Sequence, residues 1–194
     1  MPKPSDPLPI VLFDTPQTLE RWLEEHHRSS PGVWMQIAKK GSGIASVTYQ
    51  EALDIALCYG WVDSQKDKMD ERTYLQRFTP RGAKSIWSQV NKTKVEALIA
   101  SGRMQAAGLA AIEVAKANGQ WDKAYASQSN AEVPEDFAAA LERSPQAKAF
   151  FDTLNKSNKF AMLFRINNVK KQETRERKIR EFIAMLEKGE KIHL

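Results

Sequence analysis

The sequence has a single cysteine, Cys58, and its apolar runs fall far short of the roughly 18 residues that a membrane-spanning helix needs. One cysteine excludes an intramolecular disulfide, and no cysteine and histidine residues stand at the spacing of a zinc site. Internal repeats and low-complexity tracts are absent as well. These absences exclude disulfide-stapled, zinc-stapled and membrane-spanning classes of protein and indicate a reducing compartment.

The composition is that of a globular protein. Apolar residues make up 42% of the 194 residues and charged residues 27%, which is enough for an ordinary core in one domain or two small lobes. The first nine residues are rich in proline and have no apolar stretch behind Lys3, so they do not resemble a signal peptide. We therefore expect a cytoplasmic protein.

The formal net charge of +5 is unevenly distributed. Residues 156–194 carry 11 basic and 5 acidic side chains, whereas the rest of the chain is nearly neutral. A basic element of this kind attracts phosphate, nucleic acid or an anionic surface, or it is a solvated helix face held by internal ion pairs. The second interpretation is favoured by three pairs at the helical spacing of four, namely Glu173–Arg177, Glu176–Arg180 and Arg177–Glu181.

Helix and strand signals alternate in the first half of the chain. Thr48 and Glu51 have the spacing of a capping box, and Gly60 suits the left-handed end of the helix that follows. The expected elements are a helix from Pro16, a strand over residues 33–38, a helix from Thr48 to Gly60, and an antiparallel hairpin formed by residues 61–65 and 72–79.

Only helical periodicity is found from Ser85 onward. The expected helices end near Gly102 and Gly119, begin at Pro134 and Pro145, begin with Ser157 as N-cap, and carry Ile179, Phe182, Ile183 and Leu186. The fold class is therefore α+β, with a small antiparallel sheet and flanking helices in the N-terminal half and only helices in the C-terminal half. We expect lobes at residues 1–90 and 91–194, or one continuous domain.

Catalytic and metal sites find little support in the sequence. Cys58 lies in the last turn of an apolar helix, where the helix dipole disfavours a thiolate, so it is expected to be a buried structural residue. His26 and His27 are adjacent and point about 100° apart on a helix, so they do not share a metal ion. We expect no catalytic residue, no metal site and no cofactor.

The segment from Arg77 to Ser88 is the strongest candidate for ligand binding. It combines three cations with two serines at the start of the next helix, where free backbone amides favour an anion, and nearby indoles offer stacking faces. The candidate ligand-binding residues are Trp61, Asp63, Arg77, Arg81, Lys84, Ser85 and Trp87. In the alternative interpretation Ser85 or Ser88 is only an N-cap, the tryptophans belong to the core, and Arg77 pairs with Asp63 across the hairpin.

A second basic cluster lies near the C-terminus and consists of Lys170, Lys171, Arg175, Arg177 and Arg180. These side chains either bind phosphates as a patch or fix their helix to the sheet lobe through ion pairs. Tertiary fastening is the favoured interpretation.

Several strings in the sequence resemble the YdeI/OmpD-associated, bacteriocin-protection family, in the same order over nearly the whole chain. These strings lie at residues 33–34, 39–41, 51–63, 76–81, 85–88, 91, 102–104, 108–109, 121–122, 124–125 and 173–179. The first half is also similar to the YjbR/CyaY-like and DUF1801 group of small α+β domains. The family name implies protection against bacteriocins or stress and a porin association, which would require an export signal that this sequence lacks.

Three functions remain open at this point. The first is a non-enzymatic stress or bacteriocin-protection protein that binds an anionic small molecule or a protein partner through the segment around Arg81. The second is nucleic-acid binding through the basic C-terminal helices. The third is an enzyme in which Asp63 acts with Tyr74 or Arg77.

Overall fold

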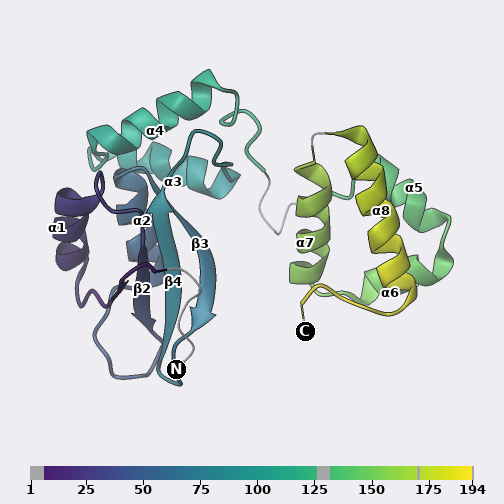
Figure 1. Cartoon of the computed structure of the whole chain (residues 1–194), viewed down its shortest axis with the longest axis horizontal. Helices are drawn as coiled ribbons and strands as arrows, with labels where there is room; N and C mark the ends of the chain where they lie inside the picture. Colours follow the sequence, from purple (N-terminus) through teal and green to yellow (C-terminus); the bar gives the residue numbers. More distant parts are fainter. Residues whose placement is uncertain (1–6, 126–131, 170, 194) are drawn as a thin grey trace. The chain divides into compact units, whose positions relative to one another are not determined.

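The computed structural model describes residues 7–125, 132–169 and 171–193 and divides the chain into two compact units, Met1–Ala124 and Tyr125–Leu194 (Figure 1). The sequence predicted lobes at residues 1–90 and 91–194 or one continuous domain, whereas the boundary along the chain lies between Ala124 and Tyr125. The reason is that the two helices after the hairpin bury Val95, Leu98 and Ile112 in the core of the first unit. The described part of the first unit therefore contains the whole four-stranded sheet and four helices.

The first unit is built around a four-stranded sheet. Its elements are β1 (Ile10–Val11), α1 (Pro16–His26), β2 (Val33–Ala38), α2 (Tyr49–Cys58), β3 (Trp61–Lys68), β4 (Thr73–Pro80), α3 (Gln89–Ala100) and α4 (Ala106–Ala117). The strand order is β1, β2, β4, β3, and the predicted antiparallel β3–β4 hairpin is confirmed. β1 pairs parallel to β2, so the sheet is mixed rather than purely antiparallel. With only two residues, β1 is too short to show a sequence pattern.

Local signals explain where the elements of the first unit begin and end. The Thr48 hydroxyl accepts a hydrogen bond from the Glu51 amide at 3.3 Å, and the Glu51 carboxylate accepts one from the Thr48 amide at 2.8 Å, which completes the predicted capping box of α2. Gly60 ends this helix at φ +73°, a left-handed conformation that favours glycine. The chain thus turns directly from α2 into β3.

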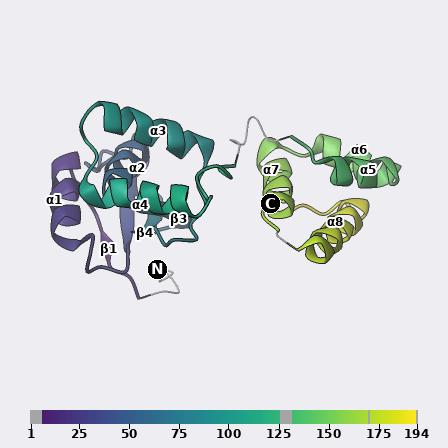
Figure 2. The ribbon, with the colours of Figure 1, turned by 90° about the horizontal axis from the view of Figure 1, so that it is seen from above.

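The core of the first unit lies on one face of the sheet. Val33, Met35 and Ile37 alternate toward it from β2 and are each at most 2% exposed. α2 is the central helix, since it contacts β3, α1, α3 and α4, and Figure 2 shows these helices grouped around it. At the outer edge, the pairing of β3 with β4 shifts register between Asp63 and Lys66, which is a β-bulge.

The described part of the second unit is helical. It contains α5 (Glu135–Glu142), α6 (Pro145–Thr153), α7 (Lys156–Asn167) and α8 (Gln172–Glu187), and α8 contacts the other three. Phe137, Met162, Ile166 and Leu186 form the fully buried centre of its core. The expected N-cap of α7 was wrong: Asn155, not Ser157, caps the helix, because its Oδ1 accepts from the Asn158 amide at 2.9 Å.

None of the described helices has both the length and the apolar character required to span a bilayer.

Candidate ligand pocket

The first unit contains a pocket of about 370 Å³, a volume within the range typical of small-molecule sites. It is enclosed by the ends of α1 and α2, the start of β3, the loop between β4 and α3, and one face of α4. The lining residues are His27, Arg28, Tyr59, Gly60, Trp61, Pro80, Arg81, Gly82, Ala83, Ser85, Trp87, Ala107, Ala110, Ala111, Val114 and Ala115. Most of them are apolar or glycine, and none of the lining residues is acidic.

Two indoles form part of the pocket wall while belonging to the core. Trp61 is fully buried and its Nε1 donates a hydrogen bond to the His27 carbonyl oxygen at 3.2 Å. Trp87 is 3% exposed and meets Trp121 edge to face, with ring centroids 4.9 Å apart. The core interpretation of these tryptophans is therefore confirmed.

Arg81 holds the loop that closes one side of the pocket. Its Cζ lies 3.8 Å from the centroid of the Trp87 ring, and its Nη1 donates to the Ile86 carbonyl oxygen at 3.2 Å. Its Nε and Nη2 atoms are buried, and its backbone amide donates to the Gly60 carbonyl oxygen at 2.9 Å. Arg81 thus contributes positive charge and shape to the wall.

The wall opposite the indoles is the small-residue face of α4, which approaches the end of α2 closely because two glycines permit it. A Cβ at Gly60 would lie 2.8 Å from the Ala107 carbonyl oxygen, and a Cβ at Gly108 would collide with the Cys58 carbonyl. The Gln105 amide also donates to the Cys58 carbonyl oxygen at 3.1 Å, which fixes the start of α4. The width of the pocket is therefore set by backbone contact.

The end of α1 supplies two polar residues that the sequence analysis did not identify as ligand-binding residues, His27 and Arg28. The His27 Nδ1 donates to the Leu23 carbonyl oxygen at 2.7 Å, which leaves Nε2 of the neutral ring as an acceptor on the far side. Arg28 is exposed, and among the described residues nothing bonds to its guanidinium. Arg28 is therefore available to an anion at the pocket.

Tyr59 lies beside His27, with ring centroids 5.4 Å apart. Burial, reinforced by the nearby Glu24 carboxylate, raises the pKa of Tyr59 to about 12. Its hydroxyl is thus neutral across the physiological pH range and does not act as an anion or a general base there.

The structure brings together four of the seven predicted ligand-binding residues, since Trp61, Arg81, Ser85 and Trp87 line the pocket. Lys84 is exposed in the same loop, between two lining residues. Two predicted residues lie elsewhere on the hairpin. Asp63 accepts a hydrogen bond from the Tyr49 hydroxyl at 2.8 Å, and Arg77 pairs in register with Trp34 and donates to the Ser64 Oγ at 3.4 Å.

The backbone amides at the start of α3, which were expected to help bind an anion, do not line this pocket. Ser88 caps α3 by accepting from the Asn91 amide at 3.1 Å, whereas the Ser85 Oγ accepts from the Gly82 amide at 3.1 Å inside the loop. The first residues of α3 are not among those that line the pocket. The cations and the helix start therefore do not form one cradle.

The residues missed by sequence reasoning have one recognisable signal. Ala107, Ala110, Ala111 and Val114 recur at the spacing of one helix face, which indicates a small-residue surface on α4. Nothing in the sequence indicates that the ends of α1 and α2 meet this face, because that arrangement depends on tertiary packing.

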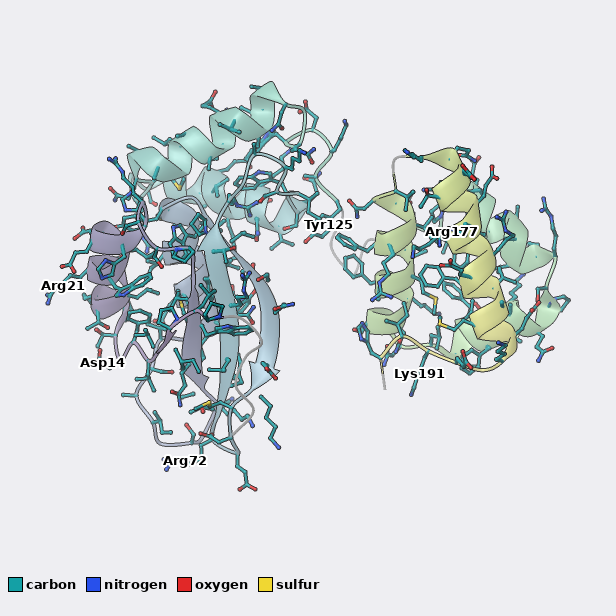
Figure 3. The ribbon with its side chains drawn as sticks, viewed as in Figure 1. Asp14, Arg21, Arg72, Tyr125, Arg177 and Lys191 are labelled. Atoms are coloured by element: carbon teal, nitrogen blue, oxygen red, sulfur yellow. The ribbon has the colours of Figure 1, made fainter. Side chains whose placement is uncertain are left out.

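The C-terminal basic cluster is partly used inside its own unit. Nε and Nη2 of Arg175 donate to the Asp136 carboxylate on α5 at 2.6 and 2.9 Å, and Nη1 donates to the Ile166 carbonyl oxygen at 2.8 Å. Arg177, which projects from α8 in Figure 3, pairs with Glu181 at 2.8 Å. Arg175 therefore fastens α8 to α5 and α7 within the helical unit, whereas the sequence predicted fastening to the sheet lobe.

The other members of this cluster differ in their placement. Lys171 is exposed at the N-cap position before α8, Arg180 is exposed on α8, and Lys170 lies outside the described residues.

Cys58 is 3% exposed, and burial raises the pKa of its thiol, which confirms the structural interpretation. Within residues 7–125, 132–169 and 171–193, no three His, Cys, Asp or Glu side chains are grouped so that they could hold a metal ion.

Two protein-family models match separate parts of the chain. Residues 11–111 match a domain of unknown function, DUF8412, and residues 130–189 match the family described as "Bacteriocin-protection, YdeI or OmpD-Associated". The second match supports the predicted resemblance in the C-terminal part, whereas the first does not confirm the predicted similarity to the YjbR/CyaY-like and DUF1801 group. No curated protein and no solved structure matches the chain. Because the first match covers 101 of the 194 residues, more than half, the chain belongs to the DUF8412 family.

Proposed function

We propose that the protein is a non-enzymatic binding protein whose first unit holds a small organic anion with an apolar body. The observation that carries this proposal is the 370 Å³ pocket, whose walls are mostly apolar and whose charged lining residues, Arg28 and Arg81, are both cationic. A pocket of apolar walls with a few convergent polar groups is the common form of a small-molecule site. The anion lies at the Arg28 side and the body lies between the indoles and α4.

The geometry supports binding better than catalysis. The Asp63 carboxylate, which an enzymatic mechanism would use, is bonded to Tyr49 and is not among the residues that line the pocket. Tyr59 remains protonated because of its raised pKa. The lining thus provides charge, shape and hydrogen bonding.

We further propose a protective role in the cell, which rests on the match of residues 130–189 to the bacteriocin-protection family. Survival of cells exposed to a bacteriocin would be compared between the wild-type chain and a variant with a blocked pocket. Equal survival with both chains would separate protection from ligand binding.

The binding proposal is tested by a thermal-shift screen with a panel of small organic anions at low salt, since a ligand that binds the native state raises its unfolding midpoint. Ala110→Leu adds three carbon atoms to an exposed residue that lines the pocket, and Ala117→Leu makes the same change on the same helix outside the lining. We expect shifts in the wild type and in Ala117→Leu but not in Ala110→Leu. Shifts that persist in Ala110→Leu, or no shift with any anion, would contradict the proposal.

A further inference from the structure

We propose that the ligand of the pocket is a small monocarboxylate with an apolar body rather than a phosphorylated molecule. This inference rests on the proposed function and adds the chemical class of the anion. It follows from the donors that the pocket has available, from its charge and from its apolar walls.

Phosphate sites commonly use backbone amides, and three amides of the loop beside the pocket already donate to other protein groups. In the loop beside the pocket, the Arg81 amide donates to Gly60 at 2.9 Å, the Gly82 amide to the Ser85 Oγ at 3.1 Å, and the Ser85 amide to Gly82 at 2.9 Å. The α3 amide at Asn91 donates to the Ser88 Oγ. These loop amides therefore do not converge on a bound phosphate.

The available charge also matches one carboxylate. Arg28 is the exposed arginine of the lining, and its planar guanidinium donates two parallel hydrogen bonds to the two oxygens of a carboxylate. A phosphate monoester brings nearly two negative charges and three acceptor oxygens. Arg81 adds positive charge, but its Nε and Nη2 atoms are buried behind the pocket surface.

The walls and the volume define the rest of the ligand. Pro80 and the alanines of α4 present apolar surface beside the nearly buried Trp87, and 370 Å³ corresponds to roughly a dozen water molecules at about 30 Å³ each. A single ring or a chain of several carbon atoms fills this space. Burial of that body supplies the favourable free energy that a free inorganic anion lacks.

The test is isothermal titration calorimetry of the full chain with benzoate, hexanoate, phenyl phosphate and benzamide. We expect one site for benzoate or hexanoate, with phenyl phosphate and benzamide binding at least tenfold more weakly. Arg28→Gln is expected to weaken carboxylate binding at least tenfold without changing benzamide binding. Ala110→Leu is expected to abolish binding, and the matched Ala117→Leu variant to retain it.

The possible outcomes separate this inference from the proposed function. Phenyl phosphate binding as tightly as the carboxylates overturns the carboxylate class and leaves the pocket as an anion site. Benzamide binding as tightly as benzoate, or an unchanged affinity in Arg28→Gln, overturns the role of the charge. Failure of all four probes to bind overturns both proposals.

Discussion

Replacing Gly108 by alanine tests the contact that sets the width of the pocket. The new Cβ would collide with the Cys58 carbonyl oxygen, would lie 2.9 Å from the Cys58 carbonyl carbon, where an ordinary contact is at least 3.4 Å, and would lie 2.6 Å from the Met104 Cε. Because the obstacle is backbone, a side-chain rotation does not relieve it, and α4 must move away from α2 by more than the roughly 0.5 Å that the carbon contact alone requires.

The expected magnitude follows from two opposing effects. Overpacking costs about 1–3 kcal/mol, and a collision with backbone places Gly108→Ala in the upper half of that range, about 2–3 kcal/mol, whereas alanine favours the helix over glycine by about 1 kcal/mol. We therefore expect the free energy of unfolding of the first unit to fall by about 1–2 kcal/mol. With a urea dependence of about 2 kcal/mol per molar, the unfolding midpoint should fall by roughly 0.5–1 M.

The assay is urea unfolding followed by tryptophan fluorescence. All 5 tryptophans of the chain lie before residue 125, so this signal reports the first unit without interference from the second. Gly82→Ala is the matched control, because the nearest heavy atom to a Cβ there is the Ser85 Oγ at 4.0 Å. A Gly108→Ala variant as stable as the wild type, or more stable, would refute the close contact between α4 and α2.

Three further changes test other parts of the structure. The Arg175 guanidinium holds the pKa of Asp136 below its usual range, so Asp136→Asn should lower the free energy of unfolding of the second unit by about 1 kcal/mol at pH 7, given the partial exposure of the pair. That difference should shrink and vanish as the pH falls through the depressed pKa, and thermal denaturation followed by circular dichroism in a series of falling pH would contradict the reasoning if the difference stayed constant. Tyr49→Phe removes the hydrogen bond to Asp63 and should cost the first unit about 1 kcal/mol in urea unfolding, so an unchanged midpoint would contradict a role in stability. Cys58 should not react with a thiol reagent in the native protein, and rapid labelling before unfolding would contradict its burial.

Much of the fold could be predicted because its signals are local. The capping box of Thr48 and Glu51, the left-handed Gly60, the alternation over residues 33–38 and the polar turn of the hairpin each depend on a few neighbouring residues. β1 escaped prediction because its two residues become a strand only by pairing with β2. The N-cap of α7 was misplaced because Asn155 and Ser157 are both good capping residues.

The pocket was predictable only in part. The loop containing Arg81, Ser85 and Trp87 was predicted as a ligand site because cations, serines and an indole lie close together in its sequence. Arg28 and the alanines of α4 were not predicted, because their role depends on which helix ends meet in space. Gly108 illustrates the difficulty, since a glycine inside a helix indicates either weakness or close packing, and only the neighbouring Cys58 carbonyl distinguishes the two.

The outer strand β3 bears on how the protein behaves in concentrated solution. An edge strand offers unpaired backbone groups to another molecule, and such pairing leads to aggregation. Here the bulge after Asp63 distorts that edge. Pairing with a second strand would also bring the exposed charges of Lys66, Asp67 and Lys68 against that strand, which disfavours the pairing. The sheet is thereby protected against growth from this side, and removing those charges should make the chain more prone to form intermolecular β-structure.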